Sequence, residues 1–207
     1  MELLDIHTHK PSLRAILNES PLDFLPCEGQ FYSLGIHPWR VKEDYGQEWE
    51  ALCQWAPHPQ VLAIGETGLD KTVPADWALQ KELFDRQIAL ARQVGKPLVI
   101  HCVKSSNEVI GEKRKQLSAV PWIIHGFRGN KELAAQFIRH GFYLSFGERY
   151  QEEALKSVPL ERMFIETDES GVDIRELYCR AALLVDIPEE EFTEKICRNI
   201  AAVFQGR

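Results

Sequence analysis

The sequence predicts an α/β barrel of the TIM type, in which parallel strands alternate with helices. Eight apolar runs of strand length recur along the 207 residues, and most are separated by segments with helical periodicity. Most of these runs are continuously apolar, as parallel strands buried on both faces are. Polar residues gather at their carboxyl ends, which is where the active sites of such barrels form. We expect residues 1–207 to form one barrel domain.

The first expected strand covers residues 2–7, where Leu3, Leu4 and Ile6 supply the apolar side chains. The second run is the weakest of the eight patterns. In chain order, the strands after the first are expected at Leu13–Leu17, Phe31–Ile36, Val61–Gly65, Pro97–Cys102, Trp122–Gly126, Phe142–Phe146 and Met163–Thr167.

The clearest helical pattern spans Pro74–Val94, because apolar side chains recur on one face. Pro74 suits the first turn of this helix, and Gly95 with Pro97 stops it. Asn130 suits the N-cap of another helix, which ends before Gly141. Further helices are expected near Glu43–Ala56, Asn107–Leu117, Gln151–Lys156, Ile174–Val185 and Glu189–Phe204.

One region does not follow the alternation of strands and helices. The stretch between His9 and His37 is too short for two full helix-plus-strand units. We therefore expect a barrel that is contracted or irregular after its first strand.

Composition and net charge narrow the classes of protein to which this chain can belong. The chain is 44% hydrophobic and 27% charged, which is ordinary for a globular protein. Its net charge of −7 disfavours a broad electrostatic grip on nucleic acid, although bound divalent metals would reverse the charge locally. The five cysteines are widely spaced, which favours reduced thiols. Because neither a signal-peptide pattern nor an apolar run of bilayer length is present, we expect a cytoplasmic protein without membrane contact.

Six residues at strand ends are of types that bind divalent metals. Side chains alternate along a strand, so His7 and His9 share one face and can grip the same ion. The full set of candidate ligands is His7, His9, Glu66, His101, His125 and Asp168. Imidazoles mixed with carboxylates suit Zn²⁺, Mn²⁺ or Mg²⁺, and two ions could share the set with Glu66 as a bridge. Such mixed sites often leave room for water, which favours chemistry over scaffolding.

Each of these residues also has a structural interpretation. A single histidine at a strand end is more often a hydrogen-bonded core residue than a ligand, and Glu66 could cap a helix. The arrival of six such residues at successive strand ends favours the metal site.

Three residues near the same ends are expected on the substrate side. His37 is expected to point into the mouth, where it would contact the substrate or support a metal ligand, because Pro38 and Trp39 after it indicate a loop of fixed shape. Lys104 and Arg128 each lie three residues after a candidate histidine ligand. Their cations could hold phosphate oxygens, and ordinary solvated loop charge is the equal alternative.

An ordered set of motifs carries a family resemblance along nearly the whole chain. It resembles the TatD family of metal-dependent deoxyribonucleases in the segments Asp5-Ile-His7-Thr-His9, Gly35-Ile-His37-Pro38, Gly65-Glu66-x-Gly68-Leu-Asp70, Ile100-His101, His125-Gly-Phe127 and Glu166-Thr-Asp168. The resemblance implies a metal-dependent hydrolase barrel of the amidohydrolase class that acts on phosphodiester bonds. It also implies that His7, His9 and Asp168 bind one metal, that His101 and His125 bind the other, and that Glu66 bridges the two.

The chain departs from the family pattern in four ways. It is short, chiefly because the region after His9 is contracted. Asp70-Lys-Thr-Val replaces aromatic residues that usually follow Gly-Leu-Asp, and Glu169-Ser-Gly-Val leads almost directly into a helix where members carry a substrate loop. Lys104 stands where the family usually has an arginine. Lysine keeps the positive charge but lacks the planar guanidinium group, which can bind a phosphate through two N–H groups.

The expected activity is metal-assisted hydrolysis of DNA, in which Asp168 accepts a proton from the attacking water as general base. The same centre could hydrolyse a small ester, a lactone or a phosphate ester instead. An alternative of another class is a non-catalytic barrel that binds metal and interacts with a partner protein.

Overall fold

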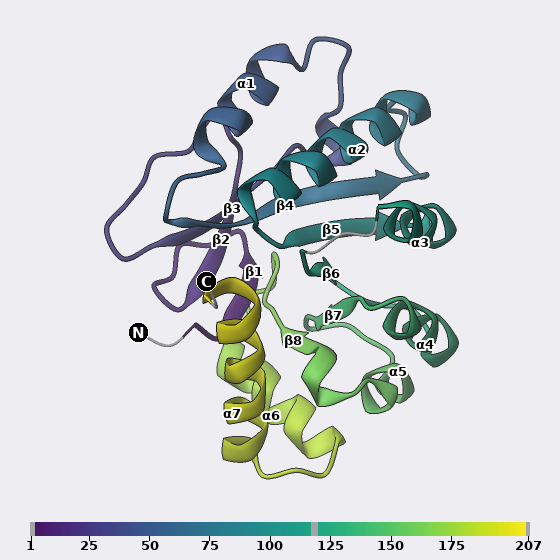
Figure 1. Cartoon of the computed structure of the whole chain (residues 1–207). Helices are drawn as coiled ribbons and strands as arrows, with labels where there is room; N and C mark the ends of the chain where they lie inside the picture. The colour runs from purple at the N-terminus through teal and green to yellow at the C-terminus, as the bar shows by residue number, and fades with distance from the viewer. Residues whose placement is uncertain (1–2, 117–119, 206–207) are drawn as a thin grey trace.

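The structure is a computed structural model that describes residues 3–116 and 120–205 (Figure 1). Eight strands form one sheet in the order of the chain, and each lies parallel to the next. They are β1 (Asp5–Thr8), β2 (Ala15–Glu19), β3 (Phe31–Leu34), β4 (Val61–Asp70), β5 (Leu98–Val103), β6 (Trp122–Ile124), β7 (Tyr143–Phe146) and β8 (Met163–Ile165). The eight predicted strands are confirmed. β4 is longer than predicted and continues past Gly65 to Asp70.

The barrel closes between β1 and the segment that follows β8. Thr8 and Asp168 form a parallel bridge. The backbone N–H of Asp168 donates to the His7 carbonyl oxygen at 2.9 Å, and the N–H of His9 donates to the Asp168 carbonyl oxygen at 3.2 Å. The buried Asp5 carboxylate accepts hydrogen bonds from the Thr167 N–H at 3.1 Å and from its hydroxyl at 2.6 Å. Closure therefore fixes the backbone of three candidate ligands.

The helices lie outside the strands (Figure 1). They are α1 (Gly46–Trp55), α2 (Trp77–Val94), α3 (Ser106–Lys115), α4 (Lys131–Arg139), α5 (Glu152–Ser157), α6 (Ile174–Leu184) and α7 (Glu189–Ile200). Each predicted helix is present, and Leu117, at the predicted end of one of them, lies outside the described residues. The predicted start of α2 at Pro74 is wrong, because the Asp76 carboxylate caps the helix by accepting from the Leu79 N–H at 2.8 Å. None of the described helices combines the length and the apolar character needed to cross a membrane.

The predicted contraction after the first strand is confirmed. Loops, rather than helices, connect β1 to β2 and β2 to β3 among the described residues (Figure 1). The buried side chain of Gln30 stabilises this region by donating to the carbonyl oxygens of Ala15 at 3.0 Å and Phe31 at 2.8 Å. Its own amide oxygen accepts from the Ser12 N–H at 3.2 Å. One side chain thus bonds backbone groups of segments that no helix covers.

Two buried glutamines of α2 fix the carboxyl ends of neighbouring strands. Gln87 accepts from the Ile36 N–H at 2.8 Å and donates to the Ile36 carbonyl oxygen at 3.1 Å. Gln80 bonds the N–H and the carbonyl oxygen of Asp70 in the same way, at 2.9 and 3.1 Å. Since Ile36 precedes His37, these contacts hold the backbone at one edge of the candidate site.

Replacing Gln87 with Met should destabilise the fold, because Met fills the space but bonds neither backbone group of Ile36. Two buried polar groups would lose their partners, and each costs about 1–3 kcal/mol. We expect the free energy of unfolding in urea to fall by about 2–4 kcal/mol. Gln93→Met, on the exposed face of the same helix, is the control. Equal stabilities of the two variants would contradict this role for Gln87.

Candidate metal centre

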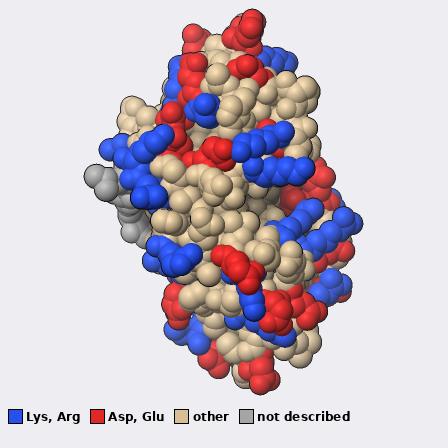
Figure 2. Space-filling view, turned by 90° about the vertical axis from the view of Figure 1, so that its right-hand side faces the viewer, with Lys and Arg blue, Asp and Glu red and all other residues tan. Residues whose placement is uncertain are grey.

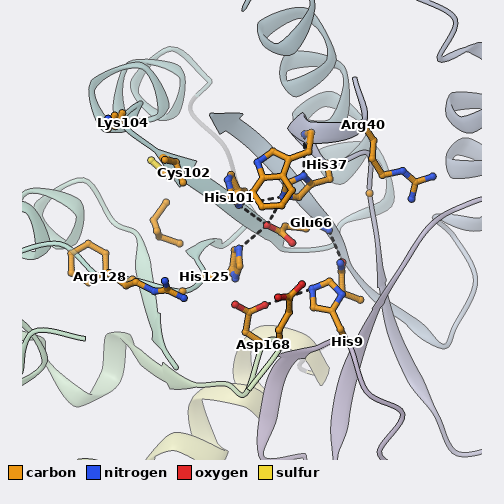
Figure 3. Close-up of a pocket in the computed structure, with 18 of the residues that line it drawn as sticks. His9, His37, Arg40, Glu66, His101, Cys102, Lys104, His125, Arg128 and Asp168 are labelled. Carbon is orange, nitrogen blue, oxygen red and sulfur yellow. Dashed lines mark hydrogen bonds and ion pairs between the residues drawn. The ribbon is translucent and has the colours of Figure 1, made fainter. Parts of the chain in front are cut away.

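A cavity of about 910 Å³ opens at the carboxyl ends of the strands. Its lining includes five of the six predicted ligands: His9, Glu66, His101, His125 and Asp168. His7 is fully buried beneath them. Figure 3 shows the Glu66 carboxylate at the middle of this group, with His37, His101 and His125 directed toward it and His9 and Asp168 beside each other. The structure therefore brings all six predicted ligands together.

Glu66 is the centre of the cluster. Its Oε1 atom lies 2.7 Å from His125 Nε2, 2.8 Å from His101 Nδ1 and 2.9 Å from His37 Nε2. Its Oε2 atom faces the first strand, at 3.6 Å from His7 Nε2. One carboxylate thus faces imidazoles from β1, β5 and the ends of β3 and β6, a position suited to a bridge between two ions.

Asp168 joins the cluster from the closing segment of the barrel. Its Oδ1 atom lies 3.7 Å from His7 Nε2 and 3.6 Å from His9 Nε2. The residue has a φ of 55°, a left-handed conformation that Asp adopts more readily than most residues.

Three sets of side chains have ligand atoms close enough to hold one ion. The sets are His7 with His9 and Glu66, His7 with His125 and Asp168, and His37 with Glu66 and His101. His37 was expected on the substrate side, but its ring nitrogen lies close enough to the ligand atoms of Glu66 and His101 to hold the same ion with them. His125 groups with His7 and Asp168, whereas the family resemblance paired it with His101.

Two further carboxylates support the histidines and were assigned no role from the sequence. Asp70 is buried, and its Oδ2 atom lies 3.0 Å from His101 Nε2. Glu166 is buried, with Oε1 at 3.3 Å from His125 Nδ1 and at 2.6 Å from the Gly126 nitrogen, which donates to it. Both belong to the motifs that carried the resemblance. A carboxylate on the second nitrogen of an imidazole fixes its tautomer and aims the first nitrogen at a metal.

The electrostatics of the cluster are dominated by its carboxylates. Burial alone would lower the pKa of His125, but Glu66 and Glu166 hold it well above its usual value. Burial would raise the pKa of Glu66, yet His125 and hydrogen bonds from His101, His125 and His37 hold it well below. Burial, with help from Glu166, raises the pKa of Asp168. Three carboxylates, those of Glu66, Glu166 and Asp168, thus crowd one site.

The residues present fit a divalent metal. His7 is completely buried, and neither of its ring nitrogens has a hydrogen-bond partner among the described residues. Burial lowers its pKa to about 3, so the imidazole is neutral near pH 7 and its lone pair is available. An unsatisfied buried nitrogen is costly, and binding a cation would satisfy it. The excess of carboxylates near Glu66 supports the same conclusion.

The two predicted substrate-binding cations lie at different places on the cavity wall. Lys104 and Arg128 are exposed and both line the cavity. In Figure 3, Arg128 extends toward His125 and Asp168, whereas Lys104 lies farther from them. Figure 2 faces the side toward which β4 and β5 point, and it shows Lys and Arg side chains flanking the middle of that side. Lys104 and Arg128 thus line the cavity together with the acidic residues Glu19, Asp23 and Glu169.

Replacing His7 with Asn should remove metal from the protein. We expect wild type, loaded with Zn²⁺ or Mn²⁺ and desalted, to keep more ions per chain by elemental analysis than His7→Asn. Metal at about 1,000 times its Kd stabilises a folded protein by about 4 kcal/mol, so the Tm of wild type should rise more on loading. His140→Asn, at the end of α4, is the control. Equal metal content in His7→Asn and wild type would contradict the site.

Replacing Asp70 with Asn should weaken metal binding by about 10- to 100-fold, because the partner that fixes the His101 tautomer loses its charge. Competition with a coloured chelator measures the affinity. The matched control is Asp76→Asn, since Asn also caps helices and Asp76 does not line the cavity. An unchanged affinity in Asp70→Asn would show that Asp70 does not act through His101.

The chain resembles several known proteins in sequence. The family model described as TatD related DNase matches residues 27–205. An uncharacterized metal-dependent hydrolase of Bacillus subtilis, YabD, is 34% identical over 149 residues, which cover 67% of this chain and 58% of that protein. Deoxyribonuclease Tat-D of Schizosaccharomyces pombe is 30% identical over 164 residues, covering 69% and 52%.

The fold has close relatives among solved structures. The crystal structure of YjjV, a TatD homologue from Escherichia coli K12, superposes with a TM-score of 0.83 at 18% sequence identity, covering 98% of each chain. This likeness concerns the fold, and the match of the family model adds the sequence. The chain belongs to the TatD family of metal-dependent hydrolases.

Proposed function

We propose that this protein is a deoxyribonuclease that hydrolyses phosphodiester bonds with the help of two divalent ions. The observation that carries the proposal is the Glu66 cluster, which lies in the wall of an open cavity that also exposes Arg128 and Lys104. Neither cation forms an ion pair with another described residue, so both are free for phosphate oxygens. The fission yeast relative named as a deoxyribonuclease supports the same substrate.

The ions would be held by the six predicted ligands, with His37 as a further candidate next to Glu66. When bound, divalent ions make a coordinated water more acidic and stabilise negative charge on ester oxygens. Glu66 faces imidazoles on both sides, so it would keep the two ions close to each other.

Asp168 would act as general base. It lies in the wall of the cavity beside His7 and His9, and the Arg128 side chain extends toward it (Figure 3). Its carboxylate would accept the proton of the attacking water, while Arg128 binds the phosphate oxygens through its planar fork. Lys104 lies farther out and would contact a phosphate away from the reacting bond.

The direct test is cleavage of end-labelled single-stranded DNA with Mg²⁺, Mn²⁺ or Zn²⁺. We expect metal-dependent shortening by wild type, and a loss of about 100-fold or more in kcat for Asp168→Asn, because general bases contribute about 10²–10⁴-fold. Asn tolerates the left-handed backbone at this position, so the fold should persist. Asp173→Asn, a capping residue a few positions later, is the matched control.

Two results would contradict the proposal. If the Asp168→Asn variant kept normal turnover, Asp168 would not be the general base. Failure of wild type to cleave DNA with any of the ions, combined with hydrolysis of small esters or lactones, would assign the centre to another substrate.

A further inference from the structure

Trp39 presents a large apolar surface inside the main cavity. Its side chain is 64% exposed, and among the large apolar residues exposed in the described part of the chain it alone lines this cavity. Tryptophan is usually buried in large part, because its ring has much apolar area. An exposed indole in the wall of a catalytic cavity indicates a surface for a ligand.

The indole is held in a fixed orientation. Its Nε1–H donates to Asp70 Oδ2 at 2.7 Å, and Asp70 is itself buried. The other carboxylate oxygen of Asp70 accepts from the Thr72 N–H at 2.7 Å and from the Thr72 hydroxyl at 2.6 Å. The backbone N–H of Trp39 donates to His37 Nδ1 at 3.0 Å. A ring fixed in this way would lose little conformational entropy when a ligand stacks on it.

The ring also lies next to the metal cluster. Its centroid is 5.1 Å from that of His37 and 5.8 Å from that of His101, and both pairs are close to perpendicular. His37 and His101 form a candidate ligand set with Glu66. A group stacked on Trp39 would therefore be adjacent to an ester bound at Glu66.

The chemistry of the surface selects a planar ring. The N–H group of the indole is already bonded to Asp70, so the ring offers its π-face and no further donor. Base–aromatic stacking is insensitive to base identity, and it needs a base that is not already stacked in a duplex. A nucleobase is joined to its phosphate by one sugar, which suits a base on Trp39 and a phosphate at the cluster.

We propose that Trp39 forms a nucleobase-binding subsite that stacks one unpaired base beside the scissile phosphate. This inference rests on the proposed phosphodiesterase function and adds to it a contact with the base. The alternative is a purely structural role, in which the indole only shields Asp70 and His101 from water.

The test compares two single-stranded oligomers of equal length with phosphorothioate linkages that resist cleavage. One is oligothymidylate, and the other carries abasic residues throughout. Kd values are measured by fluorescence anisotropy for metal-loaded wild type, Trp39→Ala, Trp39→Phe and the control Leu25→Ala, whose side chain is exposed outside the cavity. Metal content is measured for every variant.

We expect Trp39→Ala to weaken binding of oligothymidylate by about 10- to 100-fold and to leave the abasic oligomer unchanged. Trp39→Phe should keep much of the affinity because it keeps an aromatic face, and Leu25→Ala should match wild type. If Trp39→Ala lost affinity equally for both oligomers, or for neither, the proposal that Trp39 stacks a base would be wrong.

Cleavage of ordinary oligothymidylate by wild type is followed in parallel. Absence of cleavage would count against the proposed function, while the two Kd values would still decide whether Trp39 binds a base.

Discussion

The Glu66 carboxylate is the contact on which the rest of the site depends. One of its oxygens lies within 2.9 Å of imidazole nitrogens from His37, His101 and His125. His101 lies in β5, whereas His37 and His125 follow β3 and β6, and the parallel strands of the barrel bring all three to the same atom. A buried carboxylate needs positive charge beside it, and the neighbouring imidazoles and a bound cation both meet that need.

Folding and site formation share the same hydrogen bonds. The backbone of Asp168 pairs with His7 and His9 to close the barrel, so closure and ligand placement are one event. The glutamines of α2 fix Ile36 and Asp70 at the opposite side of the mouth. The loops between β1 and β3 contain no helix, and other parts of the chain hold the strand ends around the site. These loops can therefore be short. This explains how a contracted chain keeps a complete set of candidate ligands.

The sequence was most informative where periodicity and residue type coincide. Buried parallel strands leave continuous apolar runs, and a histidine at the end of such a run stands out, so the strands and the six candidate ligands were predictable. The role of Asp70 was not predictable, because the apolar run of β4 ends at Gly65 and the contact of Asp70 with His101 is made across to the neighbouring strand. The orientation of Trp39 depends on that same distant carboxylate. The start of α2 was misplaced because the cap of Asp76 prevailed over the preference of Pro74 for a first turn.

Two divalent ions are expected around Glu66. Anomalous diffraction from crystals of the protein grown with Zn²⁺ or Mn²⁺ tests this expectation most directly, since it locates the ions without reference to activity. We expect two peaks, one on each side of the Glu66 carboxylate, with one beside His7 and His9 and the other beside His101. Peaks elsewhere in the molecule, or none at this carboxylate, would contradict it.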